Sequence, residues 1–352
     1  MKPDNNLRLG TADLLKGIAV ILMIQVHLTE LFARPELRDG LIGKISLFLG
    51  GIPAAPVFMA VMGYFAIQSK NTAKSIIRGL KIILLGFLLN LGMNAHLLYE
   101  IQQHIMMLDP LPYIFGADIL FLAGFSLVFI ASVKSLIGEK LWLWAIIALF
   151  IALAGLFLPE YSGEKESLYY VQAFFWGSLS WSYFPVIPWM IYPIAGLLFY
   201  MAEKQYSLFI SRLLGSKFLL PVLAIIALST IPFGFGITTE LQTYYHHGPL
   251  FILWALVFLA FWVLLLVKIY ASMQQNRISL YVEWIGKNVT VFYVVQWLLI
   301  GNIATEIYQS QPKLLMIVWF ILILSMTSIF VLGWVWLKTF IRNKKRPIQP
   351  EA

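Results

Sequence analysis

The stretch "ADLLKGIAVILMIQVHLTE" (residues 12–30) is long and apolar enough to cross a membrane as one helix. A helix of about 20 apolar residues spans the roughly 30 Å of hydrocarbon in a bilayer. The stretch nevertheless contains four ionisable side chains, Asp13, Lys16, His27 and Glu30. A charge near the bilayer centre costs at least about 2.5–3.5 kcal/mol, so we expect these side chains to face protein or water instead of lipid.

The four ionisable side chains share one face of the expected helix. Lys16 and His27 are eleven residues apart, which is about 1,100° of rotation, so they project within about 20° of each other and lie about 16 Å apart along the axis. Asp13 and Glu30 fall within about 60° of that line, whereas Gln25 lies roughly opposite. The pattern predicts that this helix lines an internal cavity. Lys16, Asp13 and Glu30 lie near the ends of the segment, where a purely solvated role is also open.

The composition places the whole chain in a membrane. Of its 352 residues, 60% are hydrophobic and only 12% are charged, which excludes a soluble globular domain. The absence of cysteine excludes disulfides and thiolate metal sites. The net charge of +8 does not indicate a nucleic-acid partner, because the basic residues fall between apolar segments instead of forming one face.

Apolar segments of membrane-spanning length occur ten times, which predicts an all-α polytopic membrane protein with about ten transmembrane helices in one bundle. Most Lys and Arg residues fall in alternate loops and in both ends, so the positive-inside rule places both termini in the cytoplasm. The expected segments are 12–33, 46–68, 77–98, 113–134, 140–158, 184–202, 217–236, 249–271, 280–302 and 314–338.

The polar parts of the sequence are too short to form a soluble domain. We expect a cytoplasmic segment at 1–11, a transmembrane domain at 12–338 and a basic cytoplasmic tail at 339–352. The aromatic stretch at 171–181 is expected to form a helix lying at the outer membrane boundary. The membrane itself is expected to be the bacterial cytoplasmic (inner) membrane, and the oligomeric state stays open, a homo-oligomer included.

No metal is expected from the sequence. His246 and His247 are adjacent in a loop and have no recognisable third ligand, which makes a weak metal site.

The first helix resembles the corresponding helix of membrane acyltransferases, namely the acyltransferase-3 proteins and the heparan-alpha-glucosaminide N-acetyltransferase-like proteins. The similarity consists of an acidic residue, a basic residue three positions later, a small residue, an apolar run, and a His eleven positions after the basic one. Relatives usually have Arg at the position of Lys16, and Lys keeps the charge but loses the planar fork suited to phosphate. The matching residues are Arg8, Asp13, Lys16, Gly17, Ile18, Ala19, Val20 and His27.

Three later motifs resemble the same families in the same order. "APVFMAVMGYFAIQSK" is similar to the second-helix motif, with Gly63–Tyr64 near its end. "VIPWMIYPIAGLLF" resembles a Pro–Trp–x–x–Tyr helix, and "WIGKNVTVFYVVQW" resembles a late helix of the superfamily. The matching residues of these two motifs are Pro188, Trp189, Tyr192, Gly196, Gly286, Asn288, Tyr293 and Gln296.

The resemblance implies transfer of an acyl group, most often acetyl, from cytoplasmic acyl-CoA to a hydroxyl or amine of a glycan or related small-molecule acceptor. Neutral His27 could take the proton from the attacking nucleophile or carry the acyl group itself, and the sequence does not choose between these roles. Glu30, one turn further on, could orient the imidazole. At the cationic end of the helix, Lys16, Arg8, Arg78 and Lys81 would attract the donor, although Arg8, Arg78 and Lys81 could equally serve only the topology of the chain. Asp13, beside Lys16, is also a candidate for the donor site.

Side chains on later helices are candidates for contact with the substrate. Amides in membrane helices also serve as ordinary interhelical contacts, and the aromatic residue of this set lies beside two prolines, so a structural role is open for each. Glu283 and Lys287 are four residues apart and are expected to pair. The candidates are Asn288, Gln296, Tyr293, Asn90, Asn94 and Trp189.

Two other functions fit parts of the sequence. Intramembrane charges and segments broken by Pro or Gly also mark the substrate pathways of transporters and flippases. No internal repeat is visible, which counts against a secondary transporter. A structural membrane subunit would need none of the ionisable stripe for activity.

Overall fold

The computed structural model describes residues 5–158, 166–177, 179–273 and 276–344, and within them the chain is mostly helical, with one isolated β-bridge between Ala33 and Gln311. The first helices are α1 (Asn5–Leu31), α2 (Pro35–Arg38), α3 (Leu41–Gly50), α4 (Ala55–Ala66), α5 (Thr72–Met93), α6 (Ala95–Gln102), α7 (Leu111–Ile114), α8 (Ile119–Ile137), α9 (Leu141–Ala154) and α10 (Glu166–Phe175). The all-α fold predicted from the sequence is confirmed.

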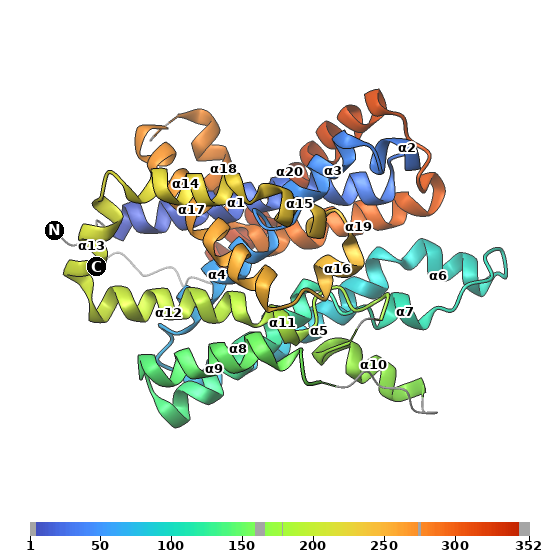
Figure 1. Ribbon diagram of the computed structural model, residues 1–352. Coiled ribbons are helices and arrows are strands. Elements are labelled where there is room, and N and C mark those ends of the chain that lie inside the picture. The colour runs from blue at the N-terminus through green and yellow to red at the C-terminus, as the bar shows by residue number, and fades with distance from the viewer. Residues whose placement is uncertain (1–4, 159–165, 178, 274–275, 345–352) are drawn as a thin grey trace, which may run out of the picture.

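The second half of the chain continues the bundle (Figure 1). Its helices are α11 (Val186–Trp189), α12 (Ile191–Gln205), α13 (Ser207–Gly215), α14 (Leu219–Ser229), α15 (Ile231–Thr238), α16 (Leu241–Tyr245), α17 (Pro249–Met273), α18 (Arg277–Lys287), α19 (Val289–Ile307) and α20 (Lys313–Lys344). The start of α1 lies at the same end of the bundle as α13 (Figure 1).

Eight helical stretches within the described residues are long and apolar enough to cross a membrane. They are Gly10–Leu31, Leu41–Ala66, Thr72–Met93, Ile119–Ile137, Val186–Gln205, Pro249–Ser272, Val289–Ile307 and Lys313–Arg342. The other two predicted segments are shorter or bent. At 140–158 the structure has α9, whose 14 residues extend only about 21 Å, and at 217–236 it has α14, which is bent by 69° from α13.

The ninth predicted segment, 280–302, is interrupted at Asn288. The side-chain amide nitrogen of Asn288 donates to the carbonyl of Trp284 at 2.9 Å, so it caps the end of α18, and α19 begins at the next residue. Glu283 and Lys287 therefore lie on α18, outside the membrane-spanning helix, where they form the expected pair at 3.5 Å.

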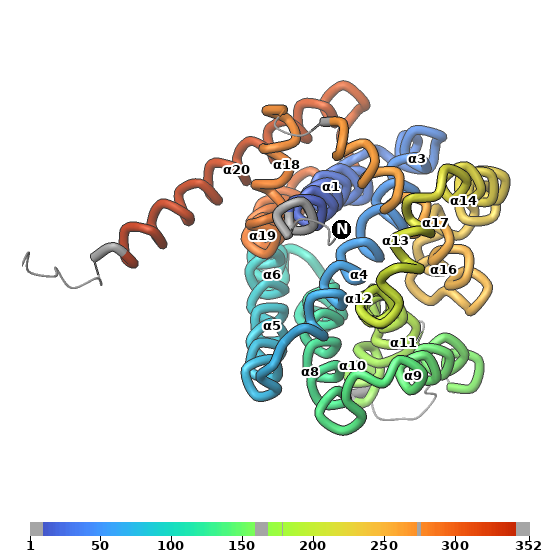
Figure 2. Tube along the Cα trace, turned by 90° about the vertical axis from the view of Figure 1, so that its left-hand side faces the viewer, coloured from blue at the N-terminus to red at the C-terminus, as the bar shows by residue number. Residues whose placement is uncertain are grey.

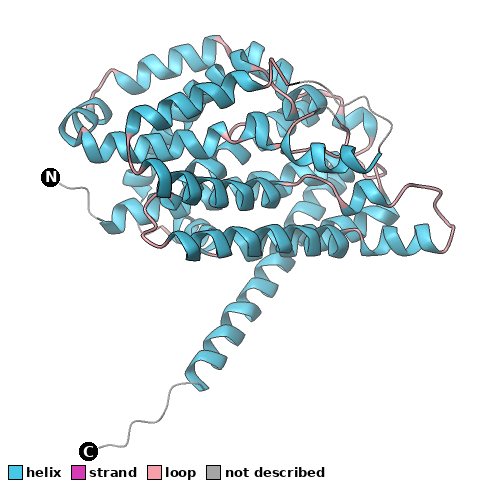
Figure 3. Ribbon diagram, turned by 90° about the horizontal axis from the view of Figure 1, so that it is seen from below, coloured by secondary structure: helices cyan, strands magenta, loops and turns pink. Residues whose placement is uncertain are grey.

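The first helix runs through the middle of the bundle. It packs against α3, α4, α17, α18, α19 and α20, and Figure 2, seen along its axis, shows these helices around it. The C-terminal part of α20 projects away from the other helices (Figure 3). A central α1 explains why its polar stripe is tolerated, since its surroundings are protein on most sides.

Glycines of the recognised motifs bring α1 and α18 into backbone contact. A Cβ atom at Gly17 would overlap the carbonyl of Val282, and one at Gly286 would overlap the carbonyl of Asp13. Small residues let membrane helices approach this closely. The N-terminal half of α1 is thereby fixed against α18.

A second reciprocal glycine pair joins α4 and α12. A Cβ atom at Gly63 would overlap the carbonyl of Pro193, and one at Gly196 would overlap the carbonyl of Ala60. The motif glycines therefore hold the bundle together, and none of these four lines the pocket described below.

Candidate active site

A pocket opens beside the C-terminal half of α1. It contains about 450 Å³ of space, counted out to its mouth, and three groups of residues line it. The α1 side has Met23, Val26, His27 and Glu30; the α3–α4 side has Leu47, Gly50, Gly51 and Ala55; the remaining side has Ile119, Phe184, Thr238, Leu241, Tyr244, Tyr245 and Tyr293.

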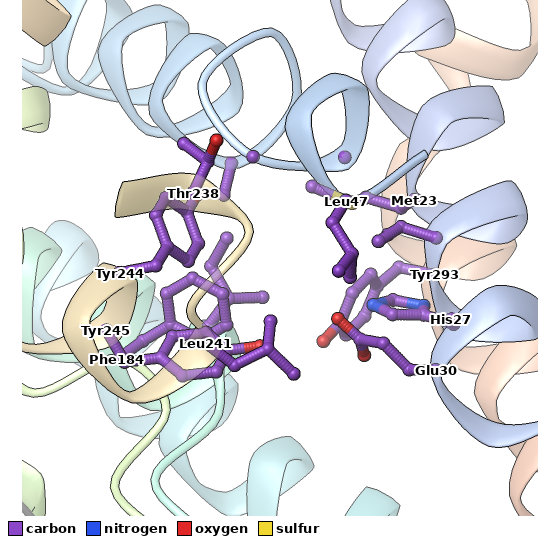
Figure 4. A pocket seen from close by; sticks show the side chains of 15 residues that line it. Met23, His27, Glu30, Leu47, Phe184, Thr238, Leu241, Tyr244, Tyr245 and Tyr293 are labelled. Atoms are coloured by element: carbon purple, nitrogen blue, oxygen red, sulfur yellow. The ribbon is translucent and has the colours of Figure 1, made fainter. Parts of the chain in front are cut away.

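His27 and Glu30 point from α1 into this pocket (Figure 4). They are three residues apart on one helix, so their side chains leave the same face. Both side chains are half-buried. The prediction that the stripe on the first helix faces an internal cavity is met at this end of the helix.

The imidazole of His27 is held by an aromatic neighbour and keeps a nitrogen free. Its ring lies 4.0 Å from the indole of Trp297, measured between centroids, with the planes inclined by 34°. Its Nδ1 atom is buried and has no hydrogen-bond partner. No hydrogen bond joins His27 to Glu30 in the described part of the chain, so the orienting role of Glu30 stays a prediction.

Opposite α1, the pocket has an aromatic wall formed by Phe184, Tyr244 and Tyr245 (Figure 4). The hydroxyl of Tyr244 is buried and has no hydrogen-bond partner. These three residues were not predicted from the sequence, because they lie on α16 and just before α11, which only the folded chain brings to α1. In the sequence, the adjacent tyrosines of "TTELQTYYHHGP" were the feature that could have indicated this aromatic wall.

Trp189 and His247 support this wall from behind. The indole nitrogen of Trp189 donates to the carbonyl of Tyr245 at 2.8 Å. His247 Nδ1 lies 2.7 Å from the carbonyl of Tyr244, and its Nε2 lies 2.9 Å from the hydroxyl of Tyr192. Burial lowers the pKa of His247 to about 4, so the neutral ring donates from Nδ1 and accepts at Nε2. Trp189 itself is fully buried and does not line the pocket.

Tyr293 reaches the pocket from α19 and is fixed by a carboxylate. Its hydroxyl lies 2.8 Å and 2.6 Å from the two carboxylate oxygens of Asp118. Asp118 also accepts from the backbone nitrogen of Ile119 at 2.6 Å and so caps the start of α8. Asp118 was not among the predicted site residues, although a lone acidic residue before an apolar run is the signature of a helix cap.

Among the candidates for substrate contact, Gln296 has a side-chain amide that makes no hydrogen bond. It is fully buried, and neither atom of its amide has a hydrogen-bond partner. It lies on α19 between Tyr293 and Trp297, which both belong to the site. A buried amide without partners costs free energy, so a ligand or ordered water would stabilise it.

The remaining amides of the predicted set bond the backbone. Asn90 donates to the carbonyls of Ile114 and Gly116, both at 2.9 Å. Asn94 donates to the carbonyls of Asn90 and Tyr113. These bonds hold the chain that leads into α8. Neither asparagine, nor Asn288, lines the pocket, and their contact with a substrate stays a prediction.

At the other end of α1, Lys16 and Asp13 pair with each other at 2.7 Å. Both side chains are only partly exposed, 21% and 16%, and the pair does not line the pocket. Arg78 and Lys81 are exposed on α5, which packs against α8 and α19. The side chain of Arg8 lies outside the described part of the chain.

Gln25, which lies off the polar stripe, has its own partners on α3. Its amide nitrogen donates to the carbonyl of Ser46 at 2.9 Å, and the Ser46 hydroxyl donates to its amide oxygen at 2.5 Å. Thr29 completes the cluster at 2.7 Å from the Ser46 hydroxyl. Polar residues on both sides of α1 are thus satisfied or face a cavity.

Comparison with known proteins agrees with this architecture. A family model described as "Acyltransferase domain" matches residues 10–337, which is most of the chain. No curated protein and no solved structure matches the sequence. The matched region includes all eight candidate spans except the last turns of α20. The chain therefore belongs to the acyltransferase-3 family of membrane acyltransferases.

Proposed function

We propose that this acyltransferase moves an acetyl group from acetyl-CoA to a hydroxyl or amine of a glycan, with His27 as the base. The observation that carries the proposal is the half-buried imidazole of His27 on the pocket wall. A general base must lie where it can reach the proton that it takes from the substrate.

In the proposed step, His27 accepts the proton of the acceptor hydroxyl while the oxygen attacks the thioester carbonyl carbon. The carbon–sulfur bond breaks, and the departing CoA thiolate takes the proton from the imidazolium. The half-buried carboxylate of Glu30 on the same wall favours the imidazolium, because opposite charges attract strongly away from bulk water.

In the alternative, a nitrogen of His27 attacks the thioester carbonyl carbon, the carbon–sulfur bond breaks and CoA leaves as the thiolate, so that an acyl-imidazole forms. The acceptor oxygen then attacks the acyl carbon, the carbon–nitrogen bond to His27 breaks, and the acceptor proton passes to the CoA thiolate.

The pocket walls support an acceptor with both polar and apolar faces. Phe184, Tyr244 and Tyr245 offer ring surface, and His27 and Glu30 offer polar groups opposite them. Binding pockets for small molecules commonly combine apolar and aromatic lining with a few placed polar groups. A sugar has this two-sided character, which is why we place the glycan here.

The donor would approach from the Lys16 end of α1. The pocket reaches along α1 only as far as Met23, whereas Lys16 lies about 16 Å from His27 along the axis. An extended pantetheine arm would carry the thioester over that length. This geometry requires both termini of the chain to face the cytoplasm, which is the orientation given by the positive-inside rule.

The test uses full-length protein in detergent or vesicles with radiolabelled acetyl-CoA and a mixture of membrane glycolipids as acceptors. We expect label in the glycan, and a loss of about 10²–10⁴ in rate for His27→Ala. A matched control is Glu36→Gln on the exposed helix α2, which should transfer like the wild type. If an acyl-histidine can be trapped when no acceptor is present, His27 carries the acyl group instead of acting as the base.

Two results would contradict the proposal. Equal transfer by His27→Ala would remove the role of the imidazole. A short acetyl thioester without the nucleotide, used as well as acetyl-CoA, would remove the dependence on CoA. Solute accumulation in vesicles without consumption of the donor would indicate transport instead.

A further inference from the structure

We propose that His96, Glu100 and Glu306 form a binding site for a divalent transition metal, of which Zn²⁺ is the representative ion. The three side chains come together where α6 meets the end of α19. One ligand atom from each lies within 4.8 Å of the others. The site is separate from the pocket around His27, because none of the three residues lines that pocket.

The spacing of these atoms fits ligands of one ion better than it fits hydrogen bonds. His96 Nε2 lies 3.7 Å from Glu100 Oε1 and 3.4 Å from Glu306 Oε1. Direct hydrogen bonds between such groups are about 2.7–3.2 Å long. Two ligands of a tetrahedral zinc ion with bonds of about 2.0–2.1 Å are separated by about 3.3 Å.

The imidazole is already oriented as a metal ligand. Its Nδ1 atom lies 3.3 Å from the backbone carbonyl of Asn302, an acceptor that favours the proton on Nδ1 and leaves the lone pair on Nε2. A metal-binding histidine almost always has such a partner on its other nitrogen. Asn302 also accepts from the backbone nitrogen of His96 at 2.9 Å, so this residue fixes both the ring and the start of α6.

The two helices present matched pairs of residues. His96 and Glu100 are four residues apart on α6, and Asn302 and Glu306 are four residues apart on α19, so each pair lies on one helix face. Just before α6 begins, the end of α5 also approaches α19 closely, because a Cβ atom at Gly301 would overlap the carbonyl of Met93. The ligands are therefore held on rigid elements instead of loops.

An unsatisfied oxygen gives the second indication of a cation. Oε2 of Glu100 is buried and has no hydrogen-bond partner, and the side chain is only 15% exposed. A buried carboxylate oxygen without a donor is unfavourable, and a metal ion would compensate it. Glu306 is 66% exposed, which leaves water free to complete the coordination.

The bound ion would clamp α6 onto α19. Metal binding to the folded chain stabilises it in proportion to the logarithm of the ion concentration. The residues are about 200 positions apart in the sequence, which is why the sequence analysis did not indicate a metal here. His246 and His247, which are adjacent to each other in the sequence, are not part of this cluster.

The experiment titrates chelator-treated, full-length protein, purified without a polyhistidine tag, with ZnCl₂ by isothermal calorimetry. We expect one ion per chain that is lost on adding EDTA. His96→Gln and Glu306→Gln should each weaken binding by at least about tenfold, since even the loss of an orienting partner costs that much. The controls His104→Asn and Glu36→Gln remove one exposed imidazole and one exposed carboxylate and should bind Zn²⁺ like the wild type.

Thermal unfolding of the same samples gives an independent measurement. Zn²⁺ should raise the Tm of the wild type by several degrees and leave that of Glu306→Gln unchanged. Size-exclusion profiles identify any variant that fails to fold. Because Glu306 is largely exposed, Glu306→Gln should disturb the fold least. Absence of stoichiometric binding, or equal affinity in His96→Gln and Glu306→Gln, would overturn the proposal and leave the three residues as ion pairs.

Discussion

The imidazole of His27 lies against the indole of Trp297, with ring centroids 4.0 Å apart and planes inclined by 34°. The two residues come from α1 and α19, so the position of the proposed base depends on how these helices pack. A shift of about 1 Å at a reacting group can lower a rate by about 10²-fold. We therefore expect Trp297 to act as a positioning residue for His27.

We predict that Trp297→Ala lowers kcat by about 10²-fold, because the imidazole loses the surface that holds its plane. Trp297→Phe keeps a flat ring at this position and should retain most of the activity. Steady-state kinetics with acetyl-CoA, together with thermal unfolding of both variants, measure the effect. A Trp297→Ala enzyme that folds and keeps the wild-type kcat would show that the ring of His27 needs no such support.

A second prediction concerns Glu30, which shares the pocket wall with His27. Glu30→Gln keeps the shape of the side chain and removes its charge, so the imidazolium formed during transfer loses a favourable electrostatic partner. We expect kcat to fall by about 10-fold to 10²-fold, less than for His27→Ala. An increase of KM at constant kcat would instead indicate that Glu30 contacts the acceptor.

The ends of the helices were harder to predict from the sequence than their existence. Apolar length alone located the membrane-spanning helices, since a bilayer imposes it. Apolar length also predicted 280–302 as one segment, because it takes no account of the side-chain amide of Asn288, which caps α18 by donating to the carbonyl of Trp284. It likewise predicted a span at 140–158, where the helix α9 has only 14 residues.

The site was predictable where it lies on one helix. His27 and Glu30 could be placed on a common face by helical periodicity. Tyr244, Tyr245 and Phe184 could not, because no local pattern reports which distant segments will close a cavity. Asp118 was missed for a related reason, since its bond to Tyr293 joins residues 175 positions apart.

Helix contact through the motif glycines gives a third prediction. Gly286→Ala places a methyl group against the carbonyl of Asp13, and overpacking of this kind costs about 1–3 kcal/mol or more. We expect a lower Tm and a displaced α1. The matched control is Gly333→Ala on α20, where nothing lies within 4 Å of the new Cβ atom. That variant should be neutral or stabilised by up to about 1 kcal/mol.

Equal unfolding temperatures for Gly286→Ala and Gly333→Ala would mean that α1 and α18 can separate without cost. Gly63→Ala tests the same principle between α4 and α12, away from the polar stripe. It should lower the Tm as Gly286→Ala does.

The fourth prediction concerns the ion pairs of Glu139, which lies between α8 and α9. Its carboxylate accepts from Lys204 at 2.7 Å and pairs with Lys134 at 3.0 Å. The bond from Lys204, followed by that from Lys134, lowers the pKa of Glu139 below its usual 4.5. The folded state therefore favours the charged form of Glu139.

The lowered pKa of Glu139 sets the sign of the pH dependence. Its contribution to stability is present above pH 4.5 and is lost as the pH falls through the lowered pKa of the folded state. At neutral pH this contribution is at its maximum.

We expect Glu139→Gln to lower the stability by about 0.2–1 kcal/mol at neutral pH, the usual value for partly exposed ion pairs. The difference from the wild type should shrink as the pH falls below 4.5 and vanish once the pH lies below the lowered pKa of the folded state, and it should also shrink in about 1 M salt. Thermal unfolding from neutral to acid pH measures it, with Glu36→Gln as the control for an unpaired surface carboxylate. A destabilisation that stays constant as the pH falls well below 4.5 would show that Glu139 acts through packing and not through its charge.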